Sequence, residues 1–580
     1  MTSSKNIEMS TDLSKPTPKK RRGRLQGKGR QVDPQALVEV QECLGALPRR
    51  KDLLIEALHL LQDTCGFLAD CHLVALAQEL RLSQAEVYEV ATFYHHFDVV
   101  KDQEPAPPPL TVRVCDSMSC MLSGAEELIA QLEQSLGPGV RVQRVPCVGR
   151  CATAPIAVVG QNPVDHATEE QVSACAQNRQ VRPTIPEYQT YARYREAGGY
   201  GQYLRCLSGE RSVESVLGEL ENSGLRGLGG AGFPAGRKWR IVRSYEGPRL
   251  LAVNIDEGEP GTFKDRHCLE HEPHRFLEGV LIACWAVGIE AVYLYLRDEY
   301  AACREVLMKE LAALQLDPPG GATLPELHLR RGAGAYVCGE ESAMIESIEG
   351  KRGMPRQRPP YIAEVGLFGR PTLEHNLETL HWVPEILEKG ARWFASQGRH
   401  GRQGLRTFSV SGRVQNPGVH LAPAGITLRE LIEEHCGGML PGHELRGYFP
   451  GGASGGILPA SRADVPLDFD TLQEHGCFIG SAAIIVFSQQ DRARDLAENA
   501  MRFFRHESCG QCTPCRVGTA KAVELMQSVV WDQELLEELS QVMEDASICG
   551  LGQAAPNPLR CTMKFFPEEV QHSHGRGGRN

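Results

Sequence analysis

Apolar and polar positions divide the chain into blocks with different periodicities. Residues 33–103 repeat apolar side chains every three or four positions, which is typical of helices that pack through one face. Ser83 and Glu86 have the spacing of a capping box at the start of the last of these helices. The Pro-rich stretch 104–109 then ends the periodicity. We therefore predict a helical leader over 33–103, followed by a domain boundary.

From residue 110 onward, short alternating segments predict strands. Residues 110–115 and 140–147 have this pattern, a helical stretch at 124–136 lies between them, and an apolar strand follows at 155–160. This order predicts a small α/β domain over 110–182, with its loops at the strand ends.

The rest of the chain continues as a multidomain α/β protein. Apolar strands at 249–256 and 291–297 alternate with helical stretches, which is the order of an α/β domain. The predicted divisions are a linker rich in Tyr, Arg and Gly at 183–222, this α/β domain at 223–400, a small α+β module at 405–490 and a helix-rich region at 491–580.

Length and charge exclude several classes of protein. The 580 residues correspond to three or four domains at about 100–200 residues each. With 62 Lys and Arg against 73 Asp and Glu, the net charge is −11, so duplex nucleic acid is not an expected partner. The longest apolar run, 279–289, is much shorter than the roughly 20 residues of a membrane span. Without a secretory pattern at the N-terminus, we expect a cytoplasmic protein with no membrane partner.

The first 32 residues are the exception to this acidic balance. They hold nine Lys and Arg against two acidic residues and almost no large apolar side chains. Such a segment cannot fold alone. It is either a solvated tail or an arm that orders on an acidic partner subunit.

Twenty cysteines are present, and eight of them form two tight groups. In a cytosolic chain, clustered thiols favour metal binding over disulfides. The other twelve are isolated in apolar or helical stretches, and we expect most of them to be inert buried thiols.

The first group has the spacing Cys115-x4-Cys120 and Cys147-x3-Cys151. Each pair follows a predicted strand, so two loops can converge on one site. Four thiolates fit either structural zinc or a [2Fe–2S] cluster, and the wide spacing favours the cluster. Two separate redox thiol pairs are the weaker alternative.

The second group is Cys509-x2-Cys512-x2-Cys515, with a fourth thiol at Cys549. Three thiolates in one loop after a helix are the compact arrangement that a [4Fe–4S] cluster needs. A zinc ribbon would require two C-x2-C pairs. Cys561 is an alternative fourth ligand.

A glycine loop opens the α/β domain. Gly227, Gly229, Gly230 and Gly232 satisfy G-x-G-x-x-G, but the preceding residues are helical, so an ordinary Rossmann site is doubtful. The loop does offer backbone amides free of side chains that can approach a flat ring and a phosphate, with Lys238 near for charge.

Two further turns carry polar side chains suited to a nucleotide. An acidic turn follows the strand 249–256 and suits ribose hydroxyls or a carboxamide. A second Gly-rich turn is followed by a basic run, and together with the glycine loop they indicate one flavin and nicotinamide pocket. The residues of these turns are Asn254, Asp256, Glu257, Glu259, Tyr336, Gly339, Glu340, Glu341, Arg358 and Tyr361.

These motifs resemble two subunits of respiratory complex I. The first cysteine group and its helical leader resemble the thioredoxin-like [2Fe–2S] subunit. From about 223 to 566 the order of motifs is similar to that of the flavoprotein subunit, including a ubiquitin-like SLBB module at about 409–486. The fusion of the two resembles the β subunit of cytosolic NAD-dependent formate dehydrogenases of the tungsten/molybdenum class.

The resemblance implies cofactors, partner and roles. FMN would lie across the glycine loop and the 336–341 turn, with NAD(H) stacked near Phe233 and oriented by Glu259 and Glu341 as the catalytic residues. The [4Fe–4S] cluster would be the primary relay and the [2Fe–2S] cluster a side site. The partner would be a larger metal-pterin subunit with further clusters. The implied cofactor-binding residues are Gly227, Gly229, Gly230, Gly232, Phe233, Lys238, Asn254, Asp256, Glu257, Tyr336, Gly339, Glu340, Arg358, Tyr361 and Asn376.

Three positions depart from that family pattern. His375 replaces the first of two consecutive Asn, so only Asn376 carries over as a flavin ligand. Arg358 replaces a Lys and keeps the charge with another geometry. Ile241 stands where relatives often have a second aromatic residue, so that aromatic ring is not available for nucleotide stacking.

Three other functions stay open from the sequence. One is the diaphorase subunit of an NAD-reducing hydrogenase, in which the N-terminal cluster cysteines are often incomplete. The second is a fused complex I module. The third is a cluster-binding scaffold without flavin, which yellow colour and flavin fluorescence would exclude. The partner's metal, tungsten or molybdenum, also stays open.

Overall fold

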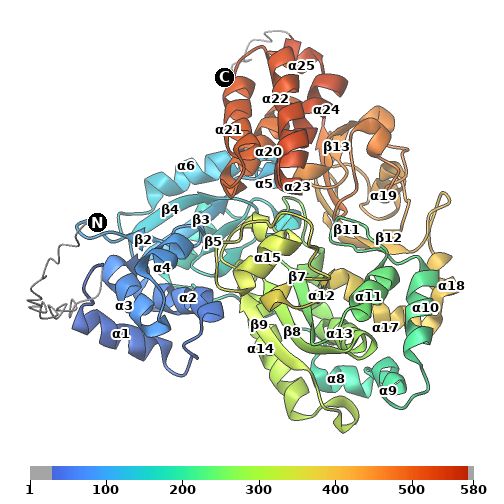
Figure 1. Cartoon of the computed structure of the whole chain (residues 1–580). Helices are drawn as coiled ribbons and strands as arrows, with labels where there is room; N and C mark the ends of the chain where they lie inside the picture. The colour runs from blue at the N-terminus through green and yellow to red at the C-terminus, as the bar shows by residue number, and fades with distance from the viewer. Residues whose placement is uncertain (1–28, 572–580) are drawn as a thin grey trace, which may run out of the picture.

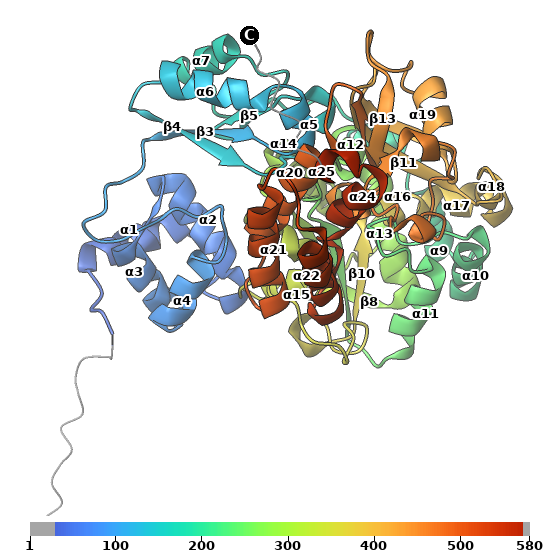
Figure 2. The ribbon, with the colours of Figure 1, turned by 90° about the horizontal axis from the view of Figure 1, so that it is seen from above.

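The computed structural model describes residues 29–571 (Figures 1 and 2). Most of the basic segment 1–32 lies outside this range, as do residues 572–580. Within the range, the backbone N–H of Arg30 donates to Gln84 Oε1 at 3.0 Å, and its guanidinium lies 3.5 Å from Asp70. The start of the described chain therefore contacts the helical leader.

The helical leader forms as its periodicity predicts. Ser83 Oγ accepts the N–H of Glu86, and the Glu86 carboxylate accepts the N–H of Ser83 at 3.0 Å, so the predicted capping box is confirmed. Two short parallel strands pair with each other within the leader. The elements are α1 (Pro34–Leu44), α2 (Leu54–Cys65), β1 (Leu68–Ala69), α3 (Asp70–Leu80), α4 (Gln84–Ala91) and β2 (Val99–Val100).

The thioredoxin-like domain is a four-stranded sheet in the order β4-β3-β5-β6 with helices packed on it. A last strand and a last helix were not predicted. The helix has its own capping box, Thr168 with Gln171, which is a sequence signal that the prediction overlooked. The elements are β3 (Leu110–Cys115), α5 (Met118–Leu122), α6 (Ala125–Ser135), β4 (Val140–Val145), β5 (Ala157–Val159), β6 (Asn162–Val164) and α7 (Glu169–Gln177).

The segment 183–222 is not the linker that its composition suggests. Tyr191, Tyr200 and Tyr203 of this segment are buried. The buried carboxylate of Glu278 accepts the backbone N–H groups of Tyr200, Gln202 and Tyr203 at 2.9–3.1 Å. A carboxylate at a helix N-terminus stabilises the helix. The helices are α8 (Tyr191–Glu196), α9 (Gly201–Leu207) and α10 (Val213–Ser223).

A parallel sheet in the order β10-β7-β8-β9 forms the centre of the next domain. Because parallel strands end at one edge, Asn254 on β7 and Asn376 on β10 lie opposite each other in register there. The elements are α11 (Ala235–Ser244), β7 (Arg249–Ile255), α12 (Lys264–His271), α13 (Pro273–Val287), β8 (Ile289–Leu296), α14 (Ala301–Leu316), β9 (Glu326–Arg331), α15 (Glu341–Ile348), β10 (Thr372–Asn376), α16 (Leu377–His381), α17 (Val383–Lys389) and α18 (Ala391–Ala395).

A second mixed sheet and a helical region complete the described chain. The sheet runs β12-β11-β15-β13-β14. Figure 1 shows the C-terminal helices beside this sheet and close to the thioredoxin-like domain. The elements are β11 (Leu405–Gly412), β12 (Gly418–Pro423), α19 (Leu428–Glu434), β13 (Leu445–Phe449), β14 (Leu458–Pro459), β15 (Ala483–Ser488), α20 (Ala493–Glu507), α21 (Thr513–Met526), α22 (Gln533–Ala546), α23 (Gly550–Ala554), α24 (Asn557–Phe565) and α25 (Glu568–Gln571).

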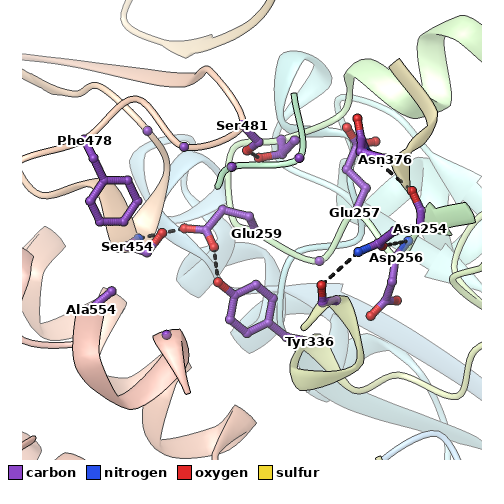
Figure 3. Close-up of a pocket in the computed structure, with 18 of the residues that line it drawn as sticks. Asn254, Asp256, Glu257, Glu259, Tyr336, Asn376, Ser454, Phe478, Ser481 and Ala554 are labelled. Atoms are coloured by element: carbon purple, nitrogen blue, oxygen red, sulfur yellow. Dashed lines mark hydrogen bonds between the residues drawn. The ribbon is translucent and has the colours of Figure 1, made fainter. Parts of the chain in front are cut away.

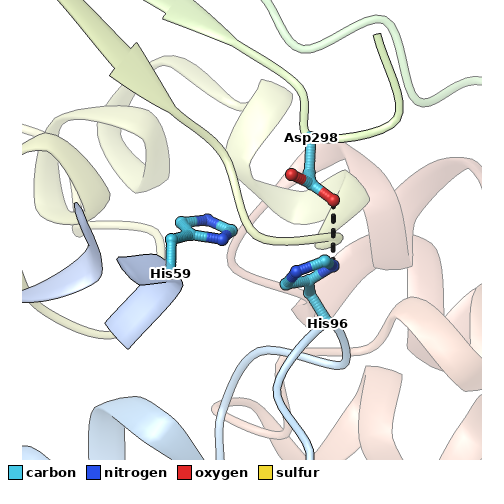
Figure 4. A group of neighbouring side chains, drawn as sticks. All are labelled: His59, His96 and Asp298. Carbon is cyan, nitrogen blue, oxygen red and sulfur yellow. Dashed lines mark ion pairs between the residues drawn. The ribbon is translucent and has the colours of Figure 1, made fainter. Parts of the chain in front are cut away.

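A polar cluster joins the leader to the parallel sheet (Figure 4). His96 Nδ1 lies 2.9 Å from Asp298 Oδ2, and His59 Nε2 lies 2.8 Å from the carbonyl of Gly332. Arg331 Nε donates to Asp298 Oδ1 at 2.5 Å. Although burial opposes ionisation, His96 and Arg331 hold the pKa of Asp298 well below its usual range. This interface is therefore a charged one.

No helix within residues 29–571 combines the length and the apolar character that a membrane span requires.

Candidate functional site

The first cysteine group converges on one buried point. Cys115 ends β3, Cys147 follows β4, and all four thiols are buried with Phe263 beside them. Cys147 Sγ and Cys151 Sγ are 3.2 Å apart, and Cys115 Sγ interacts with Cys120 and Cys147. Four thiols in mutual contact fit a [2Fe–2S] cluster.

The second group gathers at two helix starts. Cys512 is the N-cap of α21, Cys515 lies in its first turn, and Cys549 is the N-cap of α23. A Cβ at Gly552 would lie 2.8 Å from the Cβ of Cys515, so the turn that carries Cys549 packs directly on the loop. The arrangement fits a [4Fe–4S] cluster.

Cys561 lies elsewhere. Its Sγ is 3.6 Å from Cys477 Sγ, and both side chains are buried. The geometry therefore favours Cys549 as the fourth thiol of the second group. It also corrects the expectation that Cys477 and Cys561 are isolated thiols.

Two adjoining cavities lie at the edge where β7 and β10 end. The glycine-loop cavity, about 630 Å³, is lined by the glycine loop, Lys238, Glu341, Arg358 and Tyr361. The acidic cavity, about 560 Å³, is lined by the 254–259 turn and by residues of the second sheet and the C-terminal helices (Figure 3). The two share Gly229, Gly230, Asn254, Gly339 and Asn376.

The glycine loop folds back on itself. The N–H of Gly227 donates to the carbonyl of Phe233 at 2.8 Å, and Gly230 and Gly232 have the positive φ values +131° and +65°. A Cβ at Gly229 would lie 2.9 Å from Asn376 Cβ, whereas a Cβ at Gly230 would have no neighbour closer than 3.9 Å. Gly230 therefore leaves open space, as the close approach of a flat ring requires.

Asp256 carries an unpartnered carboxyl oxygen. Its Oδ2 is buried without a hydrogen bond within the described chain, and burial raises the pKa of Asp256 well above its usual value. The side chain lines the acidic cavity. A buried carboxyl oxygen without a partner beside a cavity is a feature of a binding site, which fits a cofactor here.

Asn254, Asn376 and Glu257 also form hydrogen bonds within the protein itself. Asn254 Nδ2 donates to the carbonyl of Gly339 at 2.8 Å, and Asn376 Nδ2 donates to Asp265 Oδ2 at 2.6 Å. Glu257 accepts the N–H of Asp265 at 2.9 Å and the hydroxyl of Tyr300 at 2.8 Å. The structure thus gives Glu257, predicted as a cofactor ligand, a capping contact at the start of α12.

Glu259 faces the acidic cavity (Figure 3). Its carboxylate accepts the Tyr336 hydroxyl and, at 2.7 Å, the N–H of Ser454. Burial raises the pKa of Glu259 despite these two bonds. Glu341 lines the other cavity, so the two predicted catalytic carboxylates lie on opposite sides of the shared wall.

Charged partners surround Glu341. Arg358 Nη1 lies 3.1 Å from Glu341 Oε1 and also pairs with Glu340, whose other oxygen caps α15 by accepting the N–H of Ala343 at 2.9 Å. Lys238 Nζ donates to Glu374 Oε2 at 2.7 Å. Burial, and then Glu374, raise the pKa of Glu341.

The three departures from the family pattern lie at the glycine-loop cavity. Trp239 Nε1 donates to His375 Nε2 at 2.7 Å, and burial holds the pKa of His375 well below its usual value. Ile241 lines the wall, and Phe233 and Tyr361 are 40% and 59% exposed. Two aromatic faces therefore remain available for stacking.

The sequence analysis missed several residues of this site. Lys264 Nζ is buried 2.8 Å from Asp265, 3.2 Å from Glu378 and 3.0 Å from Asn376, so it fixes Asn376. Arg297 donates to the carbonyls of Cys147 at 2.7 Å and Glu257 at 2.5 Å, which joins the first thiol group to the acidic turn. The only signals in the sequence were the position of Lys264 close to the acidic turn and the position of Arg297 at a strand end.

Comparisons with known proteins give the same division of the chain. The matching family models are the thioredoxin-like [2Fe-2S] ferredoxin at residues 40–180, the Nuo51 FMN-binding domain at 220–385, the SLBB domain at 407–458 and the NADH-ubiquinone oxidoreductase-F iron-sulfur binding region at 495–573. The F 2 subunit of the NADH-quinone oxidoreductase of Rhizobium meliloti is 40% identical over 406 residues, which cover 68% of this chain and 96% of that protein. The chain belongs to the family of NADH-quinone oxidoreductase flavoproteins.

Another relative and a solved structure extend the comparison. The flavoprotein 1 of mitochondrial NADH dehydrogenase [ubiquinone] from Dictyostelium discoideum is 41% identical over 379 residues, covering 62% of this chain and 79% of its own. A NAD+-reducing [NiFe]-hydrogenase in the H2-reduced state is similar over 91% of this chain and 94% of its own, with 29% identity and a TM-score of 0.78.

These findings confirm the fold class and the cofactor set. The protein is an NADH dehydrogenase, or diaphorase, module of this family with FMN, NAD(H), one [2Fe–2S] and one [4Fe–4S] cluster, fused to a thioredoxin-like domain.

Proposed function

We propose that this chain is the NAD(H)-reactive subunit of a formate dehydrogenase and couples formate oxidation on a metal-pterin partner to NAD+ reduction. The NAD(H)-reactive part of this proposal is supported by the pair of adjoining cavities at the edge where β7 and β10 end. FMN supplies the conversion between a two-electron hydride and the single electrons that iron–sulfur clusters carry.

Different residues hold the flavin and orient the nicotinamide nucleotide. Gly230 leaves room for the flavin, Asp256 offers an unpartnered carboxyl group to it, and Lys264 keeps Asn376 in place. Glu259, which lines the acidic cavity, and Glu341, which lines the glycine-loop cavity, orient the nicotinamide nucleotide. Arg358 supplies positive charge at the rim, where Phe233 and Tyr361 are exposed.

The eight clustered cysteines hold the two clusters. Arg297 ties the carbonyl of Cys147 to the acidic turn, which supports a [2Fe–2S] site in communication with the flavin. The [4Fe–4S] site at Cys509, Cys512, Cys515 and Cys549 lies on the helical region and is the relay toward the partner.

Formate as the partner's substrate is supported by the complete N-terminal thiol set, because the hydrogenase type often lacks part of that set. The fusion itself does not separate the two types, since the similar hydrogenase chain matches 91% of this chain. The chain shows no extended segment that resembles a pterin-metal domain, so formate would react on another subunit. A soluble electron partner rather than a nucleic acid or a membrane fits this proposal, and the cytoplasm is the proposed location.

The second candidate is the diaphorase subunit of an NAD-reducing hydrogenase. It is favoured by the structural similarity over 91% of this chain to such an enzyme. Purification of the tagged chain from its own cells separates the two candidates. A large molybdenum- or tungsten-containing polypeptide supports formate, whereas nickel-containing subunits and H2-dependent NAD+ reduction support hydrogenase.

A further inference from the structure

The pair formed by Cys477 and Cys561 lies outside both thiol groups. Cys477 belongs to the chain between β14 and β15, and Cys561 to α24 of the helical region. Their sulfurs are 3.6 Å apart, and each side chain is 2% exposed. A bond between these two sulfurs would join two parts of the fold that are 84 residues apart in the sequence.

The pair adjoins the turn that holds Glu259. A Cβ at Gly456 would lie 2.7 Å from Cys477 Sγ and 3.0 Å from Cys561 Sγ, so the backbone of this turn packs on both sulfurs. In the same turn, Ser454 donates its N–H to Glu259, and its carbonyl accepts Asn557 Nδ2 at 2.9 Å. Asn557 and Cys561 are one helical turn apart on α24.

We propose that Cys477 and Cys561 form a reversible disulfide that ties the helical cluster region to the second sheet behind Glu259. The link would fix the 451–456 turn from the side opposite the acidic cavity. This inference goes beyond the proposed function, because it holds whichever partner exchanges electrons with the protein's clusters.

The two thiols differ in a way that assigns their roles. The hydrogen bond from Cys477, helped by Lys564 and Arg560, lowers the pKa of Cys561 against the effect of burial. The same contact raises the pKa of Cys477. Cys561 is therefore the thiolate that reacts first, since the thiolate is the nucleophile.

The oxidant is a hydroperoxide. The Cys561 thiolate attacks one peroxide oxygen, the O–O bond breaks and a sulfenic acid forms with release of water. The sulfur of Cys477 then attacks the Cys561 sulfur, the S–O bond breaks, and a second water leaves. Two thiols lose two electrons and two protons, and hydrogen peroxide is reduced to two waters. A small-molecule dithiol returns the pair to the reduced form.

Peptide mapping of the full-length holoprotein tests the proposal. The protein is treated with stoichiometric hydrogen peroxide without oxygen, its free thiols are alkylated under denaturing conditions, and it is digested without reductant. We expect a linked pair of peptides containing Cys477 and Cys561, which dithiothreitol separates. Recovery of both cysteines alkylated, or oxidised singly, would overturn the proposal even if every variant failed to fold.

Matched variants test the position of the link. Cys477→Ser should abolish the linked peptides, whereas Cys436→Ser, a change at another buried cysteine of the same module, should leave them unchanged. Hydrogen exchange of the amides in 451–456 should slow on oxidation of the wild type only. Unchanged exchange in the oxidised wild type would contradict the tie to the Glu259 turn.

Discussion

At the scale of single residues, Glu259 and Gly230 separate nucleotide binding from flavin binding. Glu259→Gln removes the charge that the cavity holds between Tyr336 and Ser454, while the flavin contacts of the glycine loop stay. We expect weaker use of NADH, by roughly ten- to a hundredfold for a loss of about 1.5–3 kcal/mol, with normal FMN content. Steady-state kinetics and flavin extraction measure the two effects.

Gly230→Val is the reciprocal change. The residue has φ +131° and leaves open space, so a β-branched side chain strains the backbone and fills the room for the ring. The variant should purify with little FMN. Loss of flavin in Glu259→Gln together with normal NADH affinity would show that the two roles are exchanged.

Glu257 gives a pH-dependent stability. Burial, and then Asp265, raise the pKa of Glu257 from 4.5 to about 7. Between these pH values the folded chain binds more protons than the unfolded chain, so this group lowers stability as the pH rises from 4.5 to about 7. Glu257→Gln should remove this contribution, which thermal unfolding at several pH values measures. An equal pH dependence in both proteins would contradict the assignment.

At the scale of elements, the start of α23 decides the fourth ligand of the second cluster. The turn of Cys549 packs on Cys515, whereas Cys561 contacts Cys477. Cys549→Ala should abolish the [4Fe–4S] EPR signal of the reduced protein, and the control Cys561→Ala should keep it. Survival of the signal in Cys549→Ala would reopen the assignment of Cys561.

The elements also show what the sequence can and cannot predict. The capping box at Ser83 and the closely spaced cysteines within each group are local signals, so the sequence alone predicts these features. The start of α9 is capped by Glu278, which is distant in the sequence and reaches this helix only in the folded chain. The contacts of Lys264 with Glu378 and of Cys477 with Cys561 are likewise tertiary, so no local pattern contains them.

At the scale of the whole molecule, the basic N-terminal segment is the proposed docking element for the partner. Its positive charges have no counterpart elsewhere in a chain of net charge −11. Deletion of residues 1–28 should leave the NADH–dye activity unchanged and weaken the activity coupled to the partner, more so as salt rises. Equal coupled activity of both proteins at all salt concentrations would exclude a docking role.

The two thiol groups set the iron content of the molecule. One [2Fe–2S] and one [4Fe–4S] cluster together hold six iron atoms per chain. Iron analysis should approach this value, and the reduced protein should give two distinct EPR signals. Stoichiometric zinc with a single iron signal would contradict the assignment of Cys115, Cys120, Cys147 and Cys151.

The central claim is that this chain exchanges electrons between NAD and a formate-oxidising partner without oxidising formate itself. The most direct test is formate-dependent NAD+ reduction by the purified chain, alone and with its larger partner. Alone, the chain should reduce ferricyanide or a viologen dye with NADH and show no formate-dependent NAD+ reduction; with the partner, it should do both. Formate oxidation by the isolated chain, or coupling to H2 instead of formate in the complex, would contradict the account.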